Sequence, residues 1–147
     1  MFFRANYNVW SIKENQFDER WSFEKKIKFL AQYGIMAPSC HNTQPWKFKV
    51  VNNCLEIYPD VSKKLLIADP VGRGLYISLG CCLENIIIAS RHFGLSSLVD
   101  FEVSTNINCP AIKIIFKENH PSNADYSDLF PFISEHKMNK FDYFSNR

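Results

Sequence analysis

The sequence predicts an α+β fold in which helices pack against an antiparallel sheet. Two long segments carry apolar residues at helical spacing, and four short runs rich in β-branched and aromatic residues lie between turn signals. These segments follow one another as helix, hairpin, helix, strand, strand and a last helix. At 147 residues, the chain has the length of one domain and is long enough to bury a core of its own.

A first helix is expected to begin at Asp18 or Ser22, where apolar residues start to recur at spacings of three and four. Pro38 disfavours the helical conformation at the residue before it, so this helix must end by Met36. Residues 1–17 have no clean period. They are expected to form an N-terminal arm that lies over another surface or is loose.

Four strands are expected. Residues 46–51 (WKFKVV) and 54–59 (CLEIYP) flank the dipeptide Asn52-Asn53, which tolerates positive φ and favours a tight hairpin turn. Two further strands are expected at residues 97–104 and 111–118, with a short polar turn between them.

The most apolar part of the chain predicts a long, largely buried central helix. Asp69 and Pro70 provide an N-cap and a proline for the first turn, and Gly94 closes the helix. A last helix is expected from about Asp125 towards His136. The segment 60–70 (DVSKKLLIADP) before the central helix is expected to be a loop.

Composition and charge exclude several classes of protein. The net charge of +2 does not indicate a nucleic-acid or membrane partner. Five cysteines form an odd count with no C-x-x-C pair, and the first ten residues do not resemble a secretory signal, which together predict a reducing, cytoplasmic setting. The four histidines lack the spacing of zinc ligands, so no metal site is expected.

The stretch 37–48 (APSCHNTQPWKF) is the strongest candidate site. Prolines at both ends fix the backbone, and Trp46 is expected either to pack in the core or to lie beneath a flat ligand. The side chains between the prolines that can donate or accept hydrogen bonds are Ser39, Asn42, Thr43 and Gln44. Such a mixed set suits the edge of a planar heterocycle that alternates ring nitrogens and carbonyls.

The motif P-S-x-x-N-x-Q-P-W resembles the flavin-binding segment of the nitroreductase superfamily, and the string APSCHNTQPWKFKV resembles its two-lobed Acg-type branch. The resemblance continues through LEIYPD and DPVGRGLYISLGCCLENIIIASRHFGL and covers about Phe23 to Tyr143.

That resemblance implies a nitroreductase-like sheet packed with helices, forming one lobe of a two-lobed or dimeric FMN fold. It implies hydride transfer from NAD(P)H through the flavin to a nitro or quinone-like acceptor, with no catalytic acid or base from the chain. The implied FMN contacts are Pro38, Ser39, Asn42 and Gln44, with Lys137 and Lys140 where phosphate-binding arginines are usual.

The same resemblance divides the chain into an arm (1–17), a nitroreductase-like lobe (18–120) and the incomplete start of a second lobe (121–147). The chain is therefore expected to be truncated and to need a second lobe from another chain or from a homodimer. The alternative is a non-catalytic remnant or a module that binds or sequesters flavin.

Two residues near the motif have simpler explanations. His41 is expected to be an ordinary hydrogen-bonding group. Arg73 is expected to form an ion pair with Asp69 or a contact between lobes, since Gly72-Arg73-Gly74 matches no phosphate-binding loop.

Overall fold

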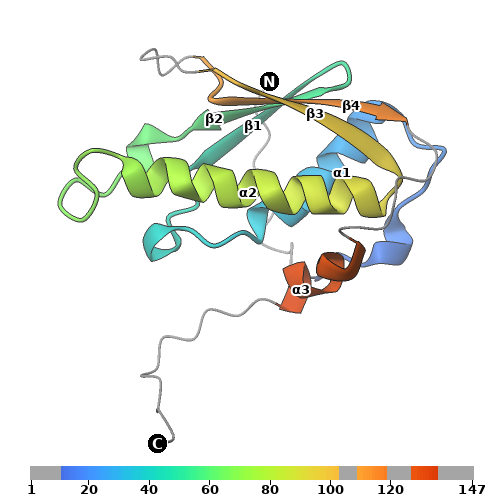
Figure 1. The fold of residues 1–147 in the computed structure, drawn as a ribbon, viewed down its shortest axis with the longest axis horizontal. Helices are drawn as coiled ribbons and strands as arrows, with labels where there is room; N and C mark the ends of the chain where they lie inside the picture. The colour runs from blue at the N-terminus through green and yellow to red at the C-terminus, as the bar shows by residue number, and fades with distance from the viewer. Residues whose placement is uncertain (1–10, 103–108, 119–126, 136–147) are drawn as a thin grey trace, which may run out of the picture.

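The computed structural model describes residues 11–102, 109–118 and 127–135. Its centre is a four-stranded antiparallel sheet, and helices α1 and α2 cover one face of that sheet (Figure 1). The predicted α+β class is confirmed.

The sheet has the order β1-β2-β4-β3. Its strands are β1 (Trp46–Val51), β2 (Cys54–Pro59), β3 (Leu95–Phe101) and β4 (Ile112–Glu118). The predicted hairpin is confirmed, since Val51 pairs with Cys54 and Asn52 takes a φ of 55° in the turn. Strand β3 begins two residues before the predicted start, and the expected residues 103 and 104 lie outside the described residues.

Helix α1 spans Phe23–Ile35. It starts at the second of the two predicted points, because the Ser22 hydroxyl caps it by accepting the Lys25 N–H. Met36 is the C-cap, as the proline at 38 required.

Helix α2 spans Arg73–His92, so the predicted start at Asp69-Pro70 is wrong by three residues. The residues from 69 to 72 form a turn, and Gly72 is the N-cap with a φ of 79°. The capping function still belongs to Asp69, whose Oδ2 accepts the Leu75 N–H at 2.9 Å. Gly94, with a φ of 72°, follows the helix as predicted.

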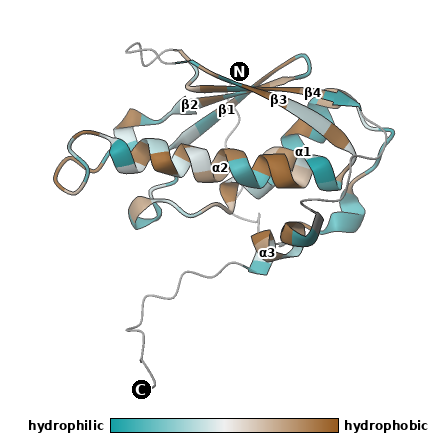
Figure 2. Ribbon diagram, in the orientation of Figure 1, coloured by the Kyte–Doolittle hydropathy of each residue, from teal (hydrophilic) through white to brown (hydrophobic). Residues whose placement is uncertain are grey.

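The core lies between the sheet and the two long helices. Side chains on the inward face of the sheet are almost fully buried: Phe48, Leu55, Ile57, Ile114 and Phe116. Figure 2 shows apolar residues, in brown, both along α2 and in the strands of the sheet. Helices α1 and α2 approach closely at Gly34, where an added Cβ would lie 2.7 Å from Ile86 Cδ1.

An aromatic cluster fastens the outer segments to the end of α2. Phe17 stacks on Phe93 with ring centroids 4.4 Å apart, and His92 stacks on Phe130 at 3.7 Å. Phe130 opens the short helix α3 (Phe130–Glu135), which follows a 3₁₀ turn at Ser127–Leu129. The last helix was expected at 125–136, and its two predicted end residues lie outside the described residues.

Helix α2 is the longest helix that the structure describes, with 20 residues. Neither it nor any other described helix is both long and apolar enough to cross a membrane.

Candidate functional site

The loop between α1 and β1 is conformationally strained. His41, Asn42 and Gln44 have φ values of 50°, 55° and 49°. This left-handed region is uncommon for residues other than glycine, and a run of such residues persists only where the surroundings enforce it. Strain of this kind gathers at functional sites, so the loop 38–44 is the candidate site.

Hydrogen bonds within the loop enforce its conformation. The Ser39 hydroxyl oxygen accepts the Gln44 N–H at 2.9 Å, and the Ser39 carbonyl accepts the Asn42 N–H at 2.9 Å. Thr43 donates both its backbone N–H and its hydroxyl to the Cys40 carbonyl, at 3.1 and 3.0 Å. The two hydroxyl side chains of the loop, Ser39 and Thr43, therefore hold the loop itself.

The first turns of α2 pack against the loop and hydrogen-bond to it. The Cys40 N–H donates to the Ser78 hydroxyl at 3.3 Å, and that hydroxyl donates to the Gly74 carbonyl at 2.7 Å. An added Cβ at Gly74 would lie 3.5 Å from the Cys40 Cβ and 3.2 Å from Asp69 Oδ2. An added Cβ would thus be in ordinary van der Waals contact with the loop, and only the Asp69 carboxylate would have to shift slightly.

The segment after β2 closes the other side of the loop. The Lys63 Nζ donates to the Gln44 carbonyl at 3.0 Å, and the Asp60 N–H donates to the Pro45 carbonyl at 2.9 Å. Asp60 also pairs with Lys47 at 3.0 Å. Lys63 therefore keeps a positive charge beside the loop.

Two amide side chains of the loop remain available. Asn42 is exposed and Gln44 is partly exposed, and neither amide group hydrogen-bonds to any residue that the structure describes. Each amide offers two N–H donors and one carbonyl acceptor. Pro38, at the start of the same loop, is also exposed. The loop therefore has hydrogen-bond donors and acceptors that no described residue uses.

Ser39 was expected to contact the ligand, but the structure places its side chain inside the loop. It is buried, with 7% of its surface exposed, and its oxygen already accepts the Gln44 N–H. Its hydroxyl hydrogen and second lone pair are unused, but the side chain is almost enclosed, so Ser39 mainly positions Gln44. The predicted contacts Lys137 and Lys140 lie outside the described residues.

The N-terminus of α2 is already occupied by a carboxylate. Burial raises the pKa of Asp69, but hydrogen bonds from the backbone N–H groups of Leu75, Gly74 and Arg73 outweigh this effect and lower the pKa overall. A ligand anion would have to displace that carboxylate. The expected ion pair between Arg73 and Asp69 is not formed, because Asp69 binds backbone groups instead.

Neither His41 nor any cluster of potential metal ligands adds a second candidate site among the described residues. His41 is exposed, and its ring has no hydrogen-bond partner within the described ranges 11–102, 109–118 and 127–135. In those same ranges no three His, Cys, Asp or Glu side chains gather closely enough to hold a metal ion.

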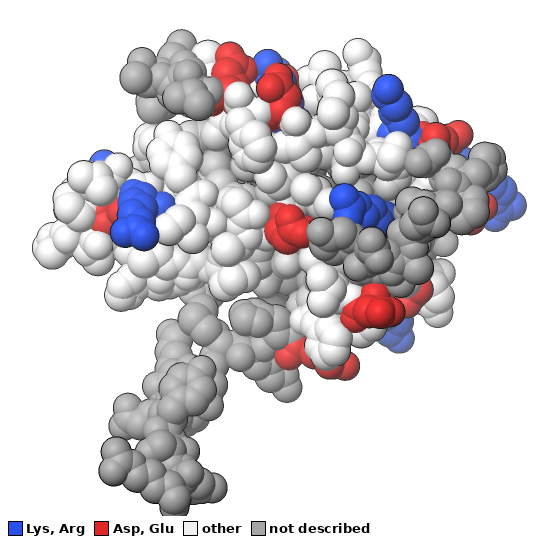
Figure 3. All heavy atoms as spheres, in the orientation of Figure 1, with Lys and Arg blue, Asp and Glu red and all other residues white. Residues whose placement is uncertain are grey.

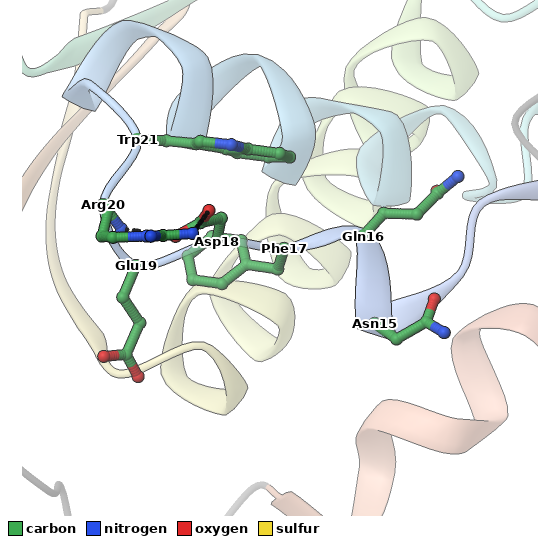
Figure 4. Close-up of a pocket in the computed structure, with 7 residues that line it drawn as sticks. All are labelled: Asn15, Gln16, Phe17, Asp18, Glu19, Arg20 and Trp21. Atoms are coloured by element: carbon green, nitrogen blue, oxygen red, sulfur yellow. Dashed lines mark hydrogen bonds and ion pairs between the residues drawn. The ribbon is translucent and has the colours of Figure 1, made fainter.

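A surface hollow of about 610 Å³ lies elsewhere, along residues 15–21. Figure 4 shows Glu19 and Arg20 at one end of it and Asn15 and Gln16 at the other. The Arg20 guanidinium is already held by Asp18 at 2.8 and 3.0 Å, and this bond lowers the pKa of Asp18 to about 2. The segment packs through Phe17 near the C-terminal end of α2, whereas the strained loop contacts its first turns. The hollow is therefore no part of the candidate site.

Sequence reasoning missed three supports of the loop: Lys63, Gly74 and Ser78. A serine at a buried position of an apolar helix was a usable signal for Ser78, because a buried hydroxyl needs a partner. Nothing in the local sequence pointed from Lys63 to the carbonyl of Gln44, 19 residues away.

The sequence and the fold resemble those of known proteins. No family model matches the sequence. A Mycobacterium tuberculosis protein with the provisional name NAD(P)H nitroreductase is 29% identical over 99 residues, which are 67% of this chain and 29% of that protein. A second one, NAD(P)H nitroreductase acg, is 28% identical over 74 residues, 50% of this chain and 22% of its own length.

A solved structure shares the fold. The crystal structure of a protein provisionally named NADH oxidase, from Clostridium acetobutylicum, has a TM-score of 0.54 and 17% identity, and the match covers 81% of this chain and 84% of that chain. Relatives and fold together support assignment of the chain to the nitroreductase superfamily. The chain spans less than a third of the length of the curated relatives it matches.

Proposed function

We propose that the loop 38–44 binds FMN and that the chain is the flavin-binding part of an oxidoreductase of the nitroreductase type. The observation that carries the proposal is the pair of unpartnered amides, Asn42 and Gln44, presented on a strained loop that the surrounding structure holds in place. The names of the relatives support the same class of reaction.

The chemistry of the loop fits the pyrimidine edge of a flavin. That edge alternates carbonyl acceptors with a ring N–H donor, and an amide side chain can serve either kind of group. Lys63 adds a positive charge beside Gln44, where it favours negative charge on a ligand held at the amides. When bound, FMN would supply the redox chemistry, accepting hydride from NAD(P)H and passing it to a nitro or quinone-like acceptor.

The chain's own contribution is to bind and orient. Ser39 fixes Gln44, and Ser78 fixes Cys40, so the two amides face a ligand without first having to be ordered. In this proposal Lys137 and Lys140 hold the phosphate, and a second lobe or subunit covers the other side of the flavin. Binding of flavin without turnover is the alternative outcome.

The test is an FMN titration of the Asn42→Gly/Gln44→Gly double variant. Glycine accepts positive φ, so the loop can keep its shape while both amides are lost. Each lost hydrogen bond is worth about 0.5–1.5 kcal/mol, so we expect FMN affinity to fall by about tenfold or more. The matched control is Asn52→Gly, which removes an amide from a residue with a φ of 55° in the distant hairpin turn.

Unchanged FMN affinity in a folded double variant would make the loop a purely structural element. Trp46→Ala separates fold from binding, because this side chain is 7% exposed in the core. Losing it should lower the melting temperature with and without FMN, at a cost of about 3–5 kcal/mol. Oxidation of NAD(P)H by the FMN-loaded chain then distinguishes an enzyme from a flavin-binding module.

A further inference from the structure

The three most exposed large apolar side chains among the described residues lie in the turn between β2 and α2. Ile67 is 97% exposed, Val71 82% and Leu66 79%. In Figure 1 this segment extends past the N-terminal end of α2, at the left of the molecule. Exposed apolar side chains gathered in this way mark an interaction site.

Backbone hydrogen bonds hold the turn in shape. The Asp69 N–H donates to the Leu65 carbonyl at 2.8 Å, which closes the turn with Leu66 and Ile67 at its tip. The Asp69 carboxylate accepts the Leu75 N–H at 2.9 Å and so ties the turn to α2. The two apolar side chains are therefore presented to a partner without first having to be ordered.

The charges beside the turn are separated by sign. Both carboxylates, Asp60 and Asp69, are buried, with 7% and 8% of their surface exposed. Lys63 and Arg73 are exposed and Lys64 is partly exposed. Figure 3 shows a basic group beside uncharged atoms at this end of the molecule. The whole chain carries a net charge of only +2, but the surface around this apolar tip is locally positive.

We propose that the segment 61–73 binds the surface of an anionic lipid bilayer. Leu66 and Ile67 enter the apolar layer below the headgroups, and the basic side chains at the base of the turn contact the anionic headgroups. Charge complementarity favours this partner over a second copy of the chain, because two copies packed on the same turn would bring like charges together.

The turn adjoins the candidate flavin site, since the Lys63 Nζ donates to the Gln44 carbonyl at 3.0 Å. Binding through the turn would therefore hold the loop 38–44 close to the bilayer. An electron acceptor dissolved in the lipid, such as a quinone, would then be favoured over a water-soluble nitro compound. Only this consequence rests on the proposed function.

The test is co-sedimentation of the full chain, without FMN, with vesicles of phosphatidylcholine and with vesicles of an equal mixture of phosphatidylcholine and phosphatidylglycerol. We expect binding to the mixed vesicles that weakens as salt is added. Leu66→Asp/Ile67→Asp should weaken it by about tenfold or more, because both apolar side chains are lost from the lipid. The control is Leu98→Asp, at an apolar residue that is 61% exposed on β3.

A second pair of variants tests the charges. Lys64→Ala/Arg73→Ala should weaken binding to the mixed vesicles by about tenfold or more, since each basic side chain near an anionic surface adds to the attraction. The matched control is Lys28→Ala/Lys117→Ala, which removes the same amount of charge from exposed positions on α1 and β4. All the altered side chains lie outside the core, and thermal melts check that each variant is folded.

A wild type that stays in the supernatant with the mixed vesicles overturns the proposal. So does equal binding to both kinds of vesicle, or a turn variant that binds no more weakly than its control. Because no flavin is present, a chain that binds vesicles but not FMN overturns the proposed function alone. A chain that binds FMN but no vesicles overturns this inference alone.

Discussion

The hydroxyl oxygen of Ser39 accepts the backbone N–H of Gln44 at 2.9 Å and so closes a loop in which three residues hold positive φ. Ser39 is buried, while the amide of Gln44 has no partner among the described residues. The relationship separates two functions that the sequence could not separate. Ser39 holds the loop, and the proposed FMN contact falls to the amide of Gln44.

Ser39→Ala removes the acceptor for that N–H. We expect the free energy of unfolding to fall by about 1–3 kcal/mol, because the Gln44 N–H loses its partner and the strained conformation loses a tie. Urea denaturation measures this change. The control is Ser96→Ala, whose hydroxyl makes only a long bond of 3.4 Å to the Lys117 carbonyl at the surface. Equal stability losses in the two variants would contradict the role given to Ser39.

Gly34→Ala should destabilise the packing of α1 on α2. The new Cβ would lie 2.7 Å from Ile86 Cδ1 and 2.9 Å from Cys82 Sγ, and overpacking of this kind typically costs about 1–3 kcal/mol. The matched control is Gly80→Ala, which is also within a helix but has nothing within 4 Å of the added Cβ. It should stabilise the chain by about 0.5–1 kcal/mol.

Thermal melts compare the two alanine variants directly. Adding Ile86→Ala to Gly34→Ala removes both Ile86 atoms that lie 2.7 Å from the new Cβ, Cδ1 and Cγ1. The double variant should therefore lose less stability than the sum of the two single variants. If the Gly34→Ala variant melted at as high a temperature as Gly80→Ala, α1 and α2 could move apart to fit the new methyl group without losing stability, and the prediction would be wrong.

Asp69 should make stability depend on pH in the acid range. Its pKa is lowered in the folded protein from an ordinary value of 3.8, so its contribution to stability is fully present above about pH 4. That contribution is lost as the pH falls through the lower, folded pKa. Asp69→Asn should therefore be less stable than the wild type near neutral pH, and the difference should shrink in acid.

Denaturant midpoints measured across this pH range test the prediction. The control is Asp100→Asn, an exposed carboxylate on β3. A stability difference between Asp69→Asn and the wild type that stays constant down to the lowest pH would show that the charge of Asp69 does not cap α2.

The five cysteines should all titrate as free thiols after unfolding. In the folded chain Cys82 should react last, because it is fully buried and burial, with the neighbouring Cys81, raises its thiol pKa. Thiol counting before and after addition of denaturant measures the total number of free thiols and the slow reaction of Cys82. The Cys82→Ala variant should lack the slowly reacting thiol. A count below five on fresh, unfolded protein would contradict the reducing, cytoplasmic setting, which stays a prediction.

Local signals made much of the fold predictable. The hairpin at Asn52-Asn53 needs only residues that tolerate positive φ between two strands, and the end of α1 follows from Pro38 alone. The start of α2 was misplaced because Asp69 caps the helix from outside it, through a turn whose shape depends on Gly72. The division into an arm and two lobes stays a prediction.

The sequence by itself determined which chemical groups are available at the site, since prolines, amides and hydroxyls at fixed spacing are properties of the chain. Only the tertiary structure decided what each group does. Ser78 and Lys63 are far from the loop in sequence, yet their hydrogen bonds fix Cys40 and Gln44. A strained loop conformation is stable only when distant parts of the fold support it. No local pattern can therefore tell that the Ser39 hydroxyl holds the loop while the Gln44 amide has no partner among the described residues.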